Sequence, residues 1–429
     1  MEQMHPLVHL AIIWAGVFAA VVAAKKMRLT PVLFYLFIGF TLVNVGVLPK
    51  QSGPFIREFA ELGIIFIMFA LGFEESTDNF LASVKKSWGI ALFGALGPFA
   101  IAYLISDSIW GDPNISLMCA LAMTATAVSL TMVSLKSEGL QHSVVATRIM
   151  TSSVIDAIGT LVAVAIIVPL ATGQESLSIA GLIVTGGKAA LFFLAVTIIG
   201  AWIFPHKPAG WVRHVPIIGR FGVKHMLTFD HGRYATLVIL LVALVVGLAA
   251  HYFGFHPAVG AYMAGLIVKE EYFHSGEKPE SSVYAGRVQS AYEETKIIID
   301  NAAFLWIGPV FFVDLGAKLI FDWDLLMQVL PYGIVMTAGL ILVQVSTAGL
   351  AAKYTGGMTW HESLMIGLGM LGRAELAFVV MDIAYVQHQI LPVEAFFTLM
   401  MTAFILNVAV PMTIRWWRPY YDAAAARAP

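Results

Sequence analysis

Long apolar stretches, separated by short polar ones, recur along the whole chain. Each is roughly 18 to 25 residues long, the length that a helix needs to cross the hydrocarbon core of a bilayer. Only 204–233 and 270–298 form polar loops of any size. We therefore expect an all-α, multi-pass protein with a single membrane domain over 1–429. The pattern predicts thirteen spans, near residues 7–24, 30–48, 58–74, 87–106, 115–135, 146–170, 178–203, 234–252, 257–270, 299–316, 326–352, 362–386 and 394–414.

The positive charges orient these predicted spans. Of the 25 lysines and arginines, twenty fall in loops on one side of the membrane and three, Lys50, Arg57 and Lys318, fall on the other. Cytoplasmic loops carry the excess of lysine and arginine in membrane proteins. The N-terminus is therefore expected outside and the C-terminus, with a short tail at 415–429, in the cytoplasm.

The composition agrees with a membrane protein and excludes other classes. The chain is 59% hydrophobic and 12% charged, whereas about a quarter of the residues in a soluble domain are charged. The single cysteine, Cys119, excludes an internal disulfide and a site with several cysteine ligands. No nucleophile–base arrangement stands out, so we expect no enzyme activity, no cofactor and no nucleic-acid partner. The N-terminus lacks the features of a cleaved signal peptide, and the short tail predicts no attached nucleotide-binding domain.

One carboxylate, Asp156, lies inside the apolar span near 146–170, in the stretch TSSVIDAIGT. On a helix, Ser152 and Ser153 precede it by four and three positions, and Gly159 and Thr160 follow by three and four, so it belongs to a small polar stripe. A carboxylate at this depth is costly and marks an ion or proton pathway by default. Burial favours its protonated form, and its ionised form suits a small cation. Proton and cation would then compete for one group, although a structural role in bonding a neighbouring helix is the alternative.

Hydroxyl groups cluster in the span near 115–135, in the stretch TATAVSLTMVS, which contains Thr124 and Thr126. Such hydroxyls commonly bond to their own helix backbone, so helix packing is the simplest interpretation. They become candidates for a site because the span bearing Asp156 offers a matching polar surface.

The span near 362–386 contains GLGMLGR, which matches the spacing G-x-G-x-x-G. It is no dinucleotide fingerprint, because no strand precedes it and it lies within a hydrophobic span. Glycines at this density indicate close helix packing or a broken helix. Arg373 and Glu375 follow at once, which favours a break lined by polar groups. Two residues apart, they do not face each other on a regular helix, so each is expected to have its own partner, with a structural ion pair as the alternative.

Taken together, six segments resemble the monovalent cation:proton antiporter superfamily, in particular its Kef- and Nap-type branch. The similar segments are ELGIIFIMFALGFEES at 61–76, ALAMTATAVSL at 120–130, SSVIDAIGTL at 152–161, HPAVGAYMAGLIV at 256–268, WIGPVFFVDLGAKL at 306–319 and ESLMIGLGMLGRAELAFVV at 362–380. They occur in the family's order and cover nearly the whole chain.

The resemblance implies two six-helix inverted repeats, 1–170 and 234–414, joined by a linker helix at 178–203. It also implies a transport core of about 87–170 and 326–414, in which the spans near 115–135 and 362–386 break and cross. The core would move against a dimerising panel, which gives alternating access in a homodimer.

By position, the resemblance makes Asp156 the ion- and proton-binding carboxylate and places Thr126 at the crossover. Arg373 and Glu375 become the charged pair beside the second crossover. Ser152 and Ser153 are further candidates for the ion site, and Thr124 is a supporting residue.

Two positions depart from the family pattern. The residue before the binding aspartate is usually Asp, Asn or Gln and is Ile155 here, and Gln344 stands where a basic residue is often found. One titrating carboxylate would remain, so we expect electroneutral exchange of Na⁺ or K⁺ for H⁺ across a bacterial-type plasma membrane, in contact with its lipids. The alternatives are a sodium-coupled organic-anion symporter, a Kef-like efflux channel and a non-transporting sensor. The residues do not distinguish Na⁺ from K⁺.

Overall fold

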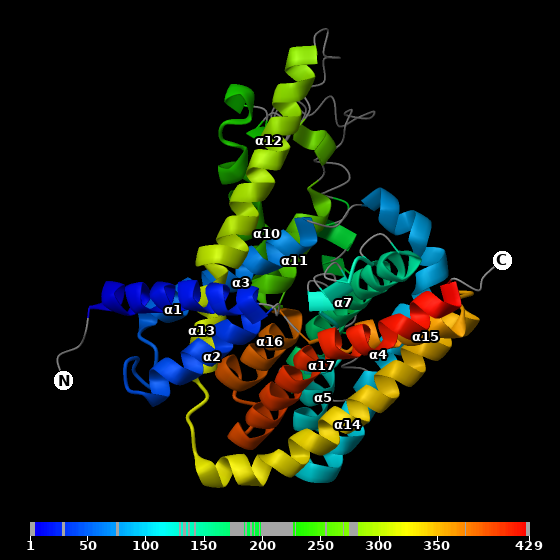
Figure 1. Cartoon of the computed structure of the whole chain (residues 1–429). Coiled ribbons are helices and arrows are strands. Elements are labelled where there is room, and N and C mark those ends of the chain that lie inside the picture. The colour runs from blue at the N-terminus through cyan, green and yellow to red at the C-terminus, as the bar shows by residue number, and fades with distance from the viewer. Residues whose placement is uncertain are drawn as a thin grey trace. The chain divides into compact units, whose positions relative to one another are not determined.

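The computed structural model describes most of the chain (Figure 1), and every regular element in the described residues is helical. For residues 77–86, 154, 230–231, 270–271, 282–291, 375 and 425, only the backbone is described. The described ranges are 5–27, 31–73, 77–127, 130–131, 134–135, 138–140, 143–171, scattered positions within 184–198, 226–227, 229–253, 255–268, 270–273, 282–373 and 375–425.

The chain divides into two compact units. The first unit comprises Met1–Ser52, Thr77–Gly181 and Phe312–Pro429, and the second comprises Gly53–Ser76 and Leu182–Phe311. The helices of the first unit are α1 (Pro6–Met27), α2 (Pro31–Asn44), α4 (Thr77–Trp110), α5 (Pro113–Ala122), α7 (Val144–Ala171), α14 (Trp323–Tyr354), α15 (Trp360–Gly369), α16 (Glu375–Asp382), η5 (Ile383–Gln387) and α17 (Val393–Ala425), with most of α13 (Gly308–Ala317). Those of the second are α3 (Pro54–Phe73), η2 (Phe229–Gly232), α10 (Ala235–Tyr252), α11 (Pro257–Ile267), η3 (Glu270–Phe273), α12 (Ser282–Asn301) and η4 (Ala302–Trp306).

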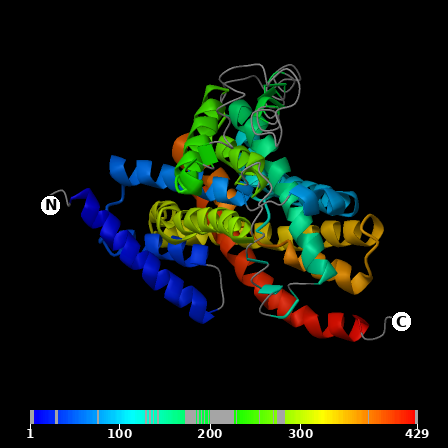
Figure 2. The same ribbon diagram turned by 90° about the horizontal axis from the view of Figure 1, so that it is seen from above.

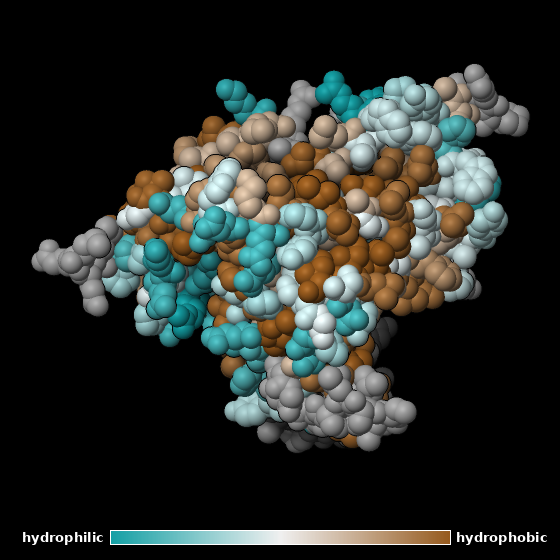
Figure 3. Space-filling model, turned by 90° about the horizontal axis from the view of Figure 1, so that it is seen from below, coloured by the Kyte–Doolittle hydropathy of each residue, from teal (hydrophilic) through white to brown (hydrophobic). Residues whose placement is uncertain are grey.

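Within the described residues, seven helical segments are long and apolar enough to cross a membrane. Many large apolar side chains on them face outward, such as Phe18, Leu104 and Leu342, which are 73%, 63% and 69% exposed. Figure 3 shows such hydrophobic residues gathered over a broad part of one face, as expected for helices that contact lipid. The seven segments are Pro6–Met27, Ser87–Trp110, Val144–Ala171, Ala235–Tyr252, Tyr292–Ala317, Trp323–Tyr354 and Val393–Ala424.

Twelve of the thirteen predicted ranges overlap described helices. The remaining range, 178–203, lies largely outside the described residues, so the count of thirteen and the inverted repeats stay predictions. The prediction of a loop over 270–298 is wrong in its second half, because α12 begins at Ser282. The pattern of apolar runs misses this part of the helix because polar residues such as Arg287 and Gln289 interrupt it.

Side-chain caps fix where several helices of the first unit begin. Asp112 accepts hydrogen bonds from the amides of Asn114 and Ile115 at the start of α5, and Asp322 caps α14 in the same way. At the start of α15, Thr359 and Glu362 form a reciprocal capping box. Each cap satisfies amides that a helix leaves unpaired in its first turn.

The first unit is organised around its longest helices. α14 packs against α4, α15 and α17, and α4 in turn packs against α5 and α7 (Figures 1 and 2). Helices α5, α7 and α15 are thereby brought together in the interior, and these are the helices that carry or adjoin the predicted site.

Two helices of this unit are interrupted where the resemblance predicted breaks. α5 ends at Ala122 and the backbone from Met123 to Ala127 is not helical, although Leu130 and Thr131 are helical again. α15 ends at Gly369, the backbone from Met370 to Arg373 is not helical, and α16 begins at Glu375. Irregular backbone is tolerated at membrane depth only where protein or water satisfies its polar groups.

The two breaks contact each other through their backbones. The amide of Ala127 donates to the carbonyl of Gly372 at 2.9 Å, and the hydroxyl of Thr131 donates to the carbonyl of Gly369 at 2.5 Å. A side chain at position 372 would meet the Cβ of Ala127 at 3.1 Å. The glycines of GLGMLGR therefore permit this close crossing.

We expect Gly39→Ala to lower thermal stability. α2 and α13 approach so closely that a Cβ at Gly39 would overlap the carbonyl of Val313 and lie 2.9 Å from the amide nitrogen of Ala317. Backbone atoms cannot move aside cheaply, so the expected cost is about 1–3 kcal/mol, measured as a lower melting temperature of the purified protein. Gly159→Ala is the matched control, because nothing lies within 4 Å of its added methyl group. Equal melting temperatures for the two variants would contradict this packing.

Candidate functional site

Asp156 lies in the middle of α7 and is 2% exposed. Its Oδ2 accepts two hydrogen bonds from Thr126, one from the backbone amide at 3.1 Å and one from the hydroxyl at 2.8 Å. The amide is available because the α5 helix has ended before Thr126, so no helical carbonyl accepts from it. The break in α5 thus provides the two donors that hold this carboxylate.

Among the residues that the structure describes, none forms a hydrogen bond with the other carboxylate oxygen of Asp156, Oδ1. One turn further along α7, the hydroxyl of Thr160 is also buried without a partner. Buried polar atoms are nearly always paired with protein or water, so an exception calls for an explanation. Here the two unpaired atoms belong to residues on the same face of the helix.

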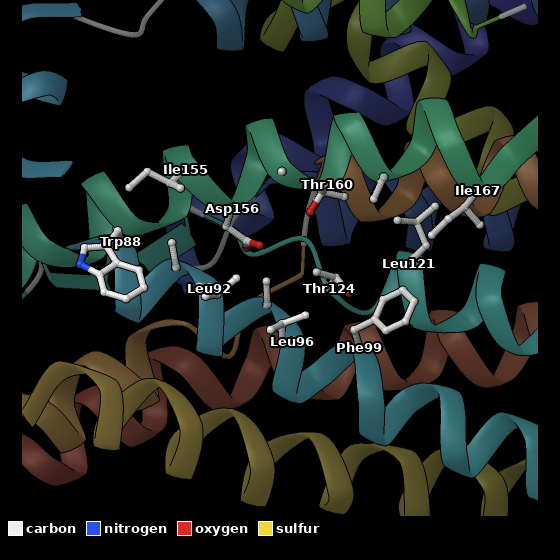
Figure 4. Close-up of a pocket in the computed structure, with 14 residues that line it drawn as sticks. Trp88, Leu92, Leu96, Phe99, Leu121, Thr124, Ile155, Asp156, Thr160 and Ile167 are labelled. Carbon is white, nitrogen blue, oxygen red and sulfur yellow. The ribbon is translucent and has the colours of Figure 1, made fainter. Parts of the chain in front are cut away.

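A cavity of about 520 Å³ adjoins these two residues. It lies between α4, α5 and α7, and its polar lining residues are Thr124, Asp156 and Thr160. Figure 4 shows Asp156 and Thr160 on α7 facing Leu92, Leu96 and Phe99 of α4 across this space. The remaining lining residues are Trp88, Ala91, Ala95, Leu121, Ile155, Gly159, Ala163 and Ile167.

Arg373 is fully buried at the break between α15 and α16. Its Nε donates to the carbonyl of Met123 at 2.8 Å, which belongs to the break in α5. Its Nη1 donates to three carbonyls of its own break, those of Met370, Leu371 and Gly372. The guanidinium therefore satisfies carbonyls that both interrupted helices leave free.

Gln344 of α14 completes the environment of Arg373. Its Oε1 accepts from Arg373 Nη2 at 2.9 Å, and its Nε2 donates to the carbonyl of Gly94 on α4 at 3.1 Å. The amide of Arg373 donates to Asn407 of α17 at 2.8 Å, and Asn407 donates back to the carbonyl of Arg373. All three side chains are buried, so this network links α4, α14, α17 and both breaks.

The structure brings some of the predicted site residues together and separates others. Thr126 contacts Asp156, while Thr124 lines the cavity and donates its own proton to the carbonyl of Ala120. Ser152 lies 3.5 Å from the carbonyl of Ser87 on α4. Ser153 and Ile155 follow on α7, the first buried and the second lining the cavity.

Of the predicted pair Arg373 and Glu375, the structure describes the side chain of Arg373 alone. Glu375 begins α16, and its side chain lies outside the described residues. Within the described part of the chain, the ion pairs join Lys318 to Asp314 and Arg418 to Glu138 and Asp422, and none of them involves Arg373 or Asp156.

Two residues of the site were not singled out from the sequence. Asn407 interrupts an otherwise apolar segment, FILNVAV, and an amide in such a segment could have indicated a buried partner. Thr160 was placed in the polar stripe but not proposed as a ligand. Its unpaired hydroxyl depends on the distance between α4 and α7, which no sequence pattern reports.

Clusters of metal-binding side chains are absent from the described ranges, where no three His, Cys, Asp or Glu residues could hold one ion. The site instead consists of one carboxylate, nearby hydroxyls and the non-helical backbone of two interrupted helices. Interrupted helices that meet around a buried ionisable group are the design of secondary transporters.

The chain belongs to the family described as "Sodium/hydrogen exchanger, transmembrane", whose sequence profile matches residues 12–417. This confirms the resemblance to the monovalent cation:proton antiporter superfamily. The chain is 21% identical to a Na⁺/H⁺ antiporter of Enterococcus hirae, over 92% of this chain and 93% of that protein. It is 22% identical to the Na⁺/H⁺–K⁺ antiporter GerN of Bacillus cereus, over 77% of this chain and 75% of that protein.

A solved structure has the same fold. The sodium proton antiporter MjNhaP1 from Methanocaldococcus jannaschii superposes with a TM-score of 0.67, at 14% sequence identity, over 97% of this chain and all of that one. The all-helical fold of this chain is therefore shared with that antiporter.

Proposed function

We propose that this protein exchanges a monovalent cation, Na⁺ or K⁺, for H⁺ by alternating access, with Asp156 binding the cation and the proton in competition. The observation that carries the proposal is the state of the Asp156 carboxylate. One oxygen is held by Thr126 at the break in α5, and the other is buried, unpaired and next to a cavity. The names of the relatives, antiporters of Na⁺ and K⁺ against H⁺, support the same activity.

The competition follows from the cost of burying a charge. An ionised carboxylate removed from water must be neutralised by a partner. The guanidinium of Arg373 already donates to four carbonyls and to Gln344. The carboxylate is therefore neutralised by a bound cation in one state and by a proton in the other, and the empty ionised state is the one that the interior disfavours.

The stoichiometry follows from the residues around Asp156. Ile155 carries no ionisable group, and Arg373 stays charged throughout because its guanidinium does not lose its proton in proteins. A site with one titrating carboxylate has the same net charge whether it holds a monovalent cation or a proton. Exchange is therefore one for one and electroneutral.

The lining of the cavity favours a cation over an organic anion. Its wall carries one carboxylate and no basic side chain, so an anionic substrate would meet repulsion at Asp156. We also propose a bacterial-type plasma membrane, with the N-terminus outside, the C-terminus in the cytoplasm and two copies forming a homodimer. The two units of the chain would correspond in part to the moving core and the dimerising panel of such a transporter.

Exchange is tested in proteoliposomes that contain a pH-sensitive dye. Addition of Na⁺, K⁺ or Li⁺ outside acid-loaded vesicles should cause proton efflux that saturates with cation concentration. Flux that rises without saturation would indicate a channel, and the absence of any flux would indicate a sensor.

Electroneutrality predicts that the rate does not change with membrane potential. The potential is set with valinomycin and K⁺ gradients while Na⁺-dependent proton efflux is recorded. If each transport cycle moved one net charge, a shift of about 100 mV would change its free energy by about 2.3 kcal/mol. We expect superimposable rates at positive, zero and negative potential. A rate that follows the potential would contradict one-for-one exchange by a single carboxylate.

A further inference from the structure

The cavity beside Asp156 is much larger than a bare alkali ion needs. Its volume of about 520 Å³ falls in the range of about 300–1,000 Å³ that is typical of sites for small organic molecules. A single water molecule in the liquid takes up about 30 Å³. A ligand that filled this space would therefore be larger than one dehydrated metal ion.

Away from Asp156, the wall of the cavity offers few oxygen ligands for a hard cation. Hard cations are held by several oxygen ligands, whereas three of the fourteen lining residues are polar. Of these, Thr124 already donates its proton to the carbonyl of Ala120. The opposite wall, on α4, consists of hydrocarbon from Leu92, Leu96 and Phe99.

Two acceptors at one side of the cavity remain open. Asp156 Oδ1 and Thr160 Oγ1 have no hydrogen-bond partner among the described residues, and both residues are 2% exposed. A charged donor between them would satisfy both, and the carboxylate would supply its counter-charge. The rest of such a ligand would have to be apolar to match the remaining wall.

We propose that the cavity binds a primary alkylammonium ion, with its nitrogen between Asp156 Oδ1 and Thr160 Oγ1 and its hydrocarbon chain against Leu92, Leu96 and Phe99. The ion competes with the transported cation for the carboxylate. This inference rests on the proposed function, because it takes Asp156 as the cation-binding group. It adds a class of ligand that combines one positive charge with an apolar body.

The length of the chain determines the affinity. Burial of a methylene group contributes about 0.8 kcal/mol, so each added methylene should tighten binding about fourfold until the cavity is filled. The charge is also required, since a neutral alcohol of equal length leaves the ionised carboxylate without a counter-charge. The dependence of affinity on both chain length and positive charge distinguishes an alkylammonium site from a purely apolar one.

Binding is measured by titration calorimetry with purified protein in detergent at neutral pH. The probes are ammonium, butylammonium and hexylammonium chloride, with 1-hexanol as the uncharged match for hexylammonium. Titration of the same detergent without protein corrects for partition of the probes into detergent, and Asp156→Asn is titrated identically. We expect saturable binding that strengthens from ammonium to hexylammonium in the wild type, none with hexanol, and none in Asp156→Asn.

Three further variants locate the ligand within the cavity. Thr160→Val should weaken hexylammonium binding about tenfold, because it removes one hydrogen bond to a charged group. Ala163→Leu adds bulk to the lining and should weaken hexylammonium more than ammonium. Val162→Leu is the matched control, since the neighbouring residue on α7 does not line the cavity, and its affinities should equal those of the wild type.

Equal binding of hexanol and hexylammonium would overturn the proposal, because the cavity would then be an apolar site such as one for a lipid chain. Equal affinity for ammonium and hexylammonium, or binding retained in Asp156→Asn, would also overturn it. Failure of the alkylammonium proposal can be distinguished from failure of the proposed exchange function. Asp156-dependent exchange of Na⁺ or K⁺ without alkylammonium binding removes this inference alone, whereas Asp156-dependent alkylammonium binding without exchange removes the proposed function.

Discussion

Asp156→Asn is expected to abolish cation-dependent proton movement in proteoliposomes, down to the leak of protein-free vesicles. Asparagine has nearly the shape of aspartate and can still accept both hydrogen bonds from Thr126, so the local structure should persist. It carries neither the charge that holds a cation nor a group that exchanges a proton at neutral pH. The loss should therefore affect both substrates at once.

The stability of the same variant distinguishes a functional defect from misfolding. Because asparagine keeps the size of the side chain and both hydrogen bonds from Thr126, the melting temperature of Asp156→Asn should stay close to that of the wild type. Asp314→Asn is the matched control, because Asp314 is also buried but is paired with Lys318 and Ser52 at the end of α13. Wild-type exchange in Asp156→Asn, or its complete loss in Asp314→Asn, would be incompatible with the proposed site.

Arg373→Met is expected to cause the largest loss of stability. The substitution removes the donors for the carbonyls of Met123, Met370 and Leu371 and for Gln344, all in the interior, and one of the two donors to the carbonyl of Gly372. Each buried acceptor left without a partner costs about 1–3 kcal/mol. The sum is of the order of a small protein's whole stability, so we expect a much lower melting temperature and a poor yield of folded protein.

Two matched variants keep this prediction testable even if Arg373→Met cannot be purified. Arg373→Lys retains the charge but offers three donors on one nitrogen instead of the planar guanidinium, so its melting temperature should lie between those of the wild type and Arg373→Met. Arg418→Met removes an arginine that is paired with Glu138 and Asp422 near the surface, where ion pairs contribute about 0–1 kcal/mol. A loss in Arg418→Met as large as that in Arg373→Lys would contradict the role given to Arg373.

The sequence predicted the parts of this site that depend on one helix or on the family pattern. The 3.6-residue period placed Asp156 in a polar stripe, and the glycines of GLGMLGR indicated a broken helix before Arg373. The resemblance added Thr126, which then proved to donate twice to Asp156. Each of these inferences needs only local spacing or a matching motif.

Other features depend on how separate helices approach, and sequence patterns do not report this. Arg373 was expected to have a partner of its own, but which groups its guanidinium meets, the carbonyls of both breaks and Gln344, could not be read from the sequence. The cavity exists because α4 stands away from α7 beside Asp156. Asn407 joins the network only because α17 passes the second break. Packing distances between helices decide all three.

The competition between cation and proton at Asp156 can be measured directly on purified, unbuffered protein with a pH indicator. A cation that displaces the proton of a carboxylate must release that proton to solution. We expect Na⁺ or K⁺ to release up to about one proton per chain from the wild type, at the pH where release is largest, and none from Asp156→Asn. Equal proton release from Asp156→Asn and the wild type would contradict it.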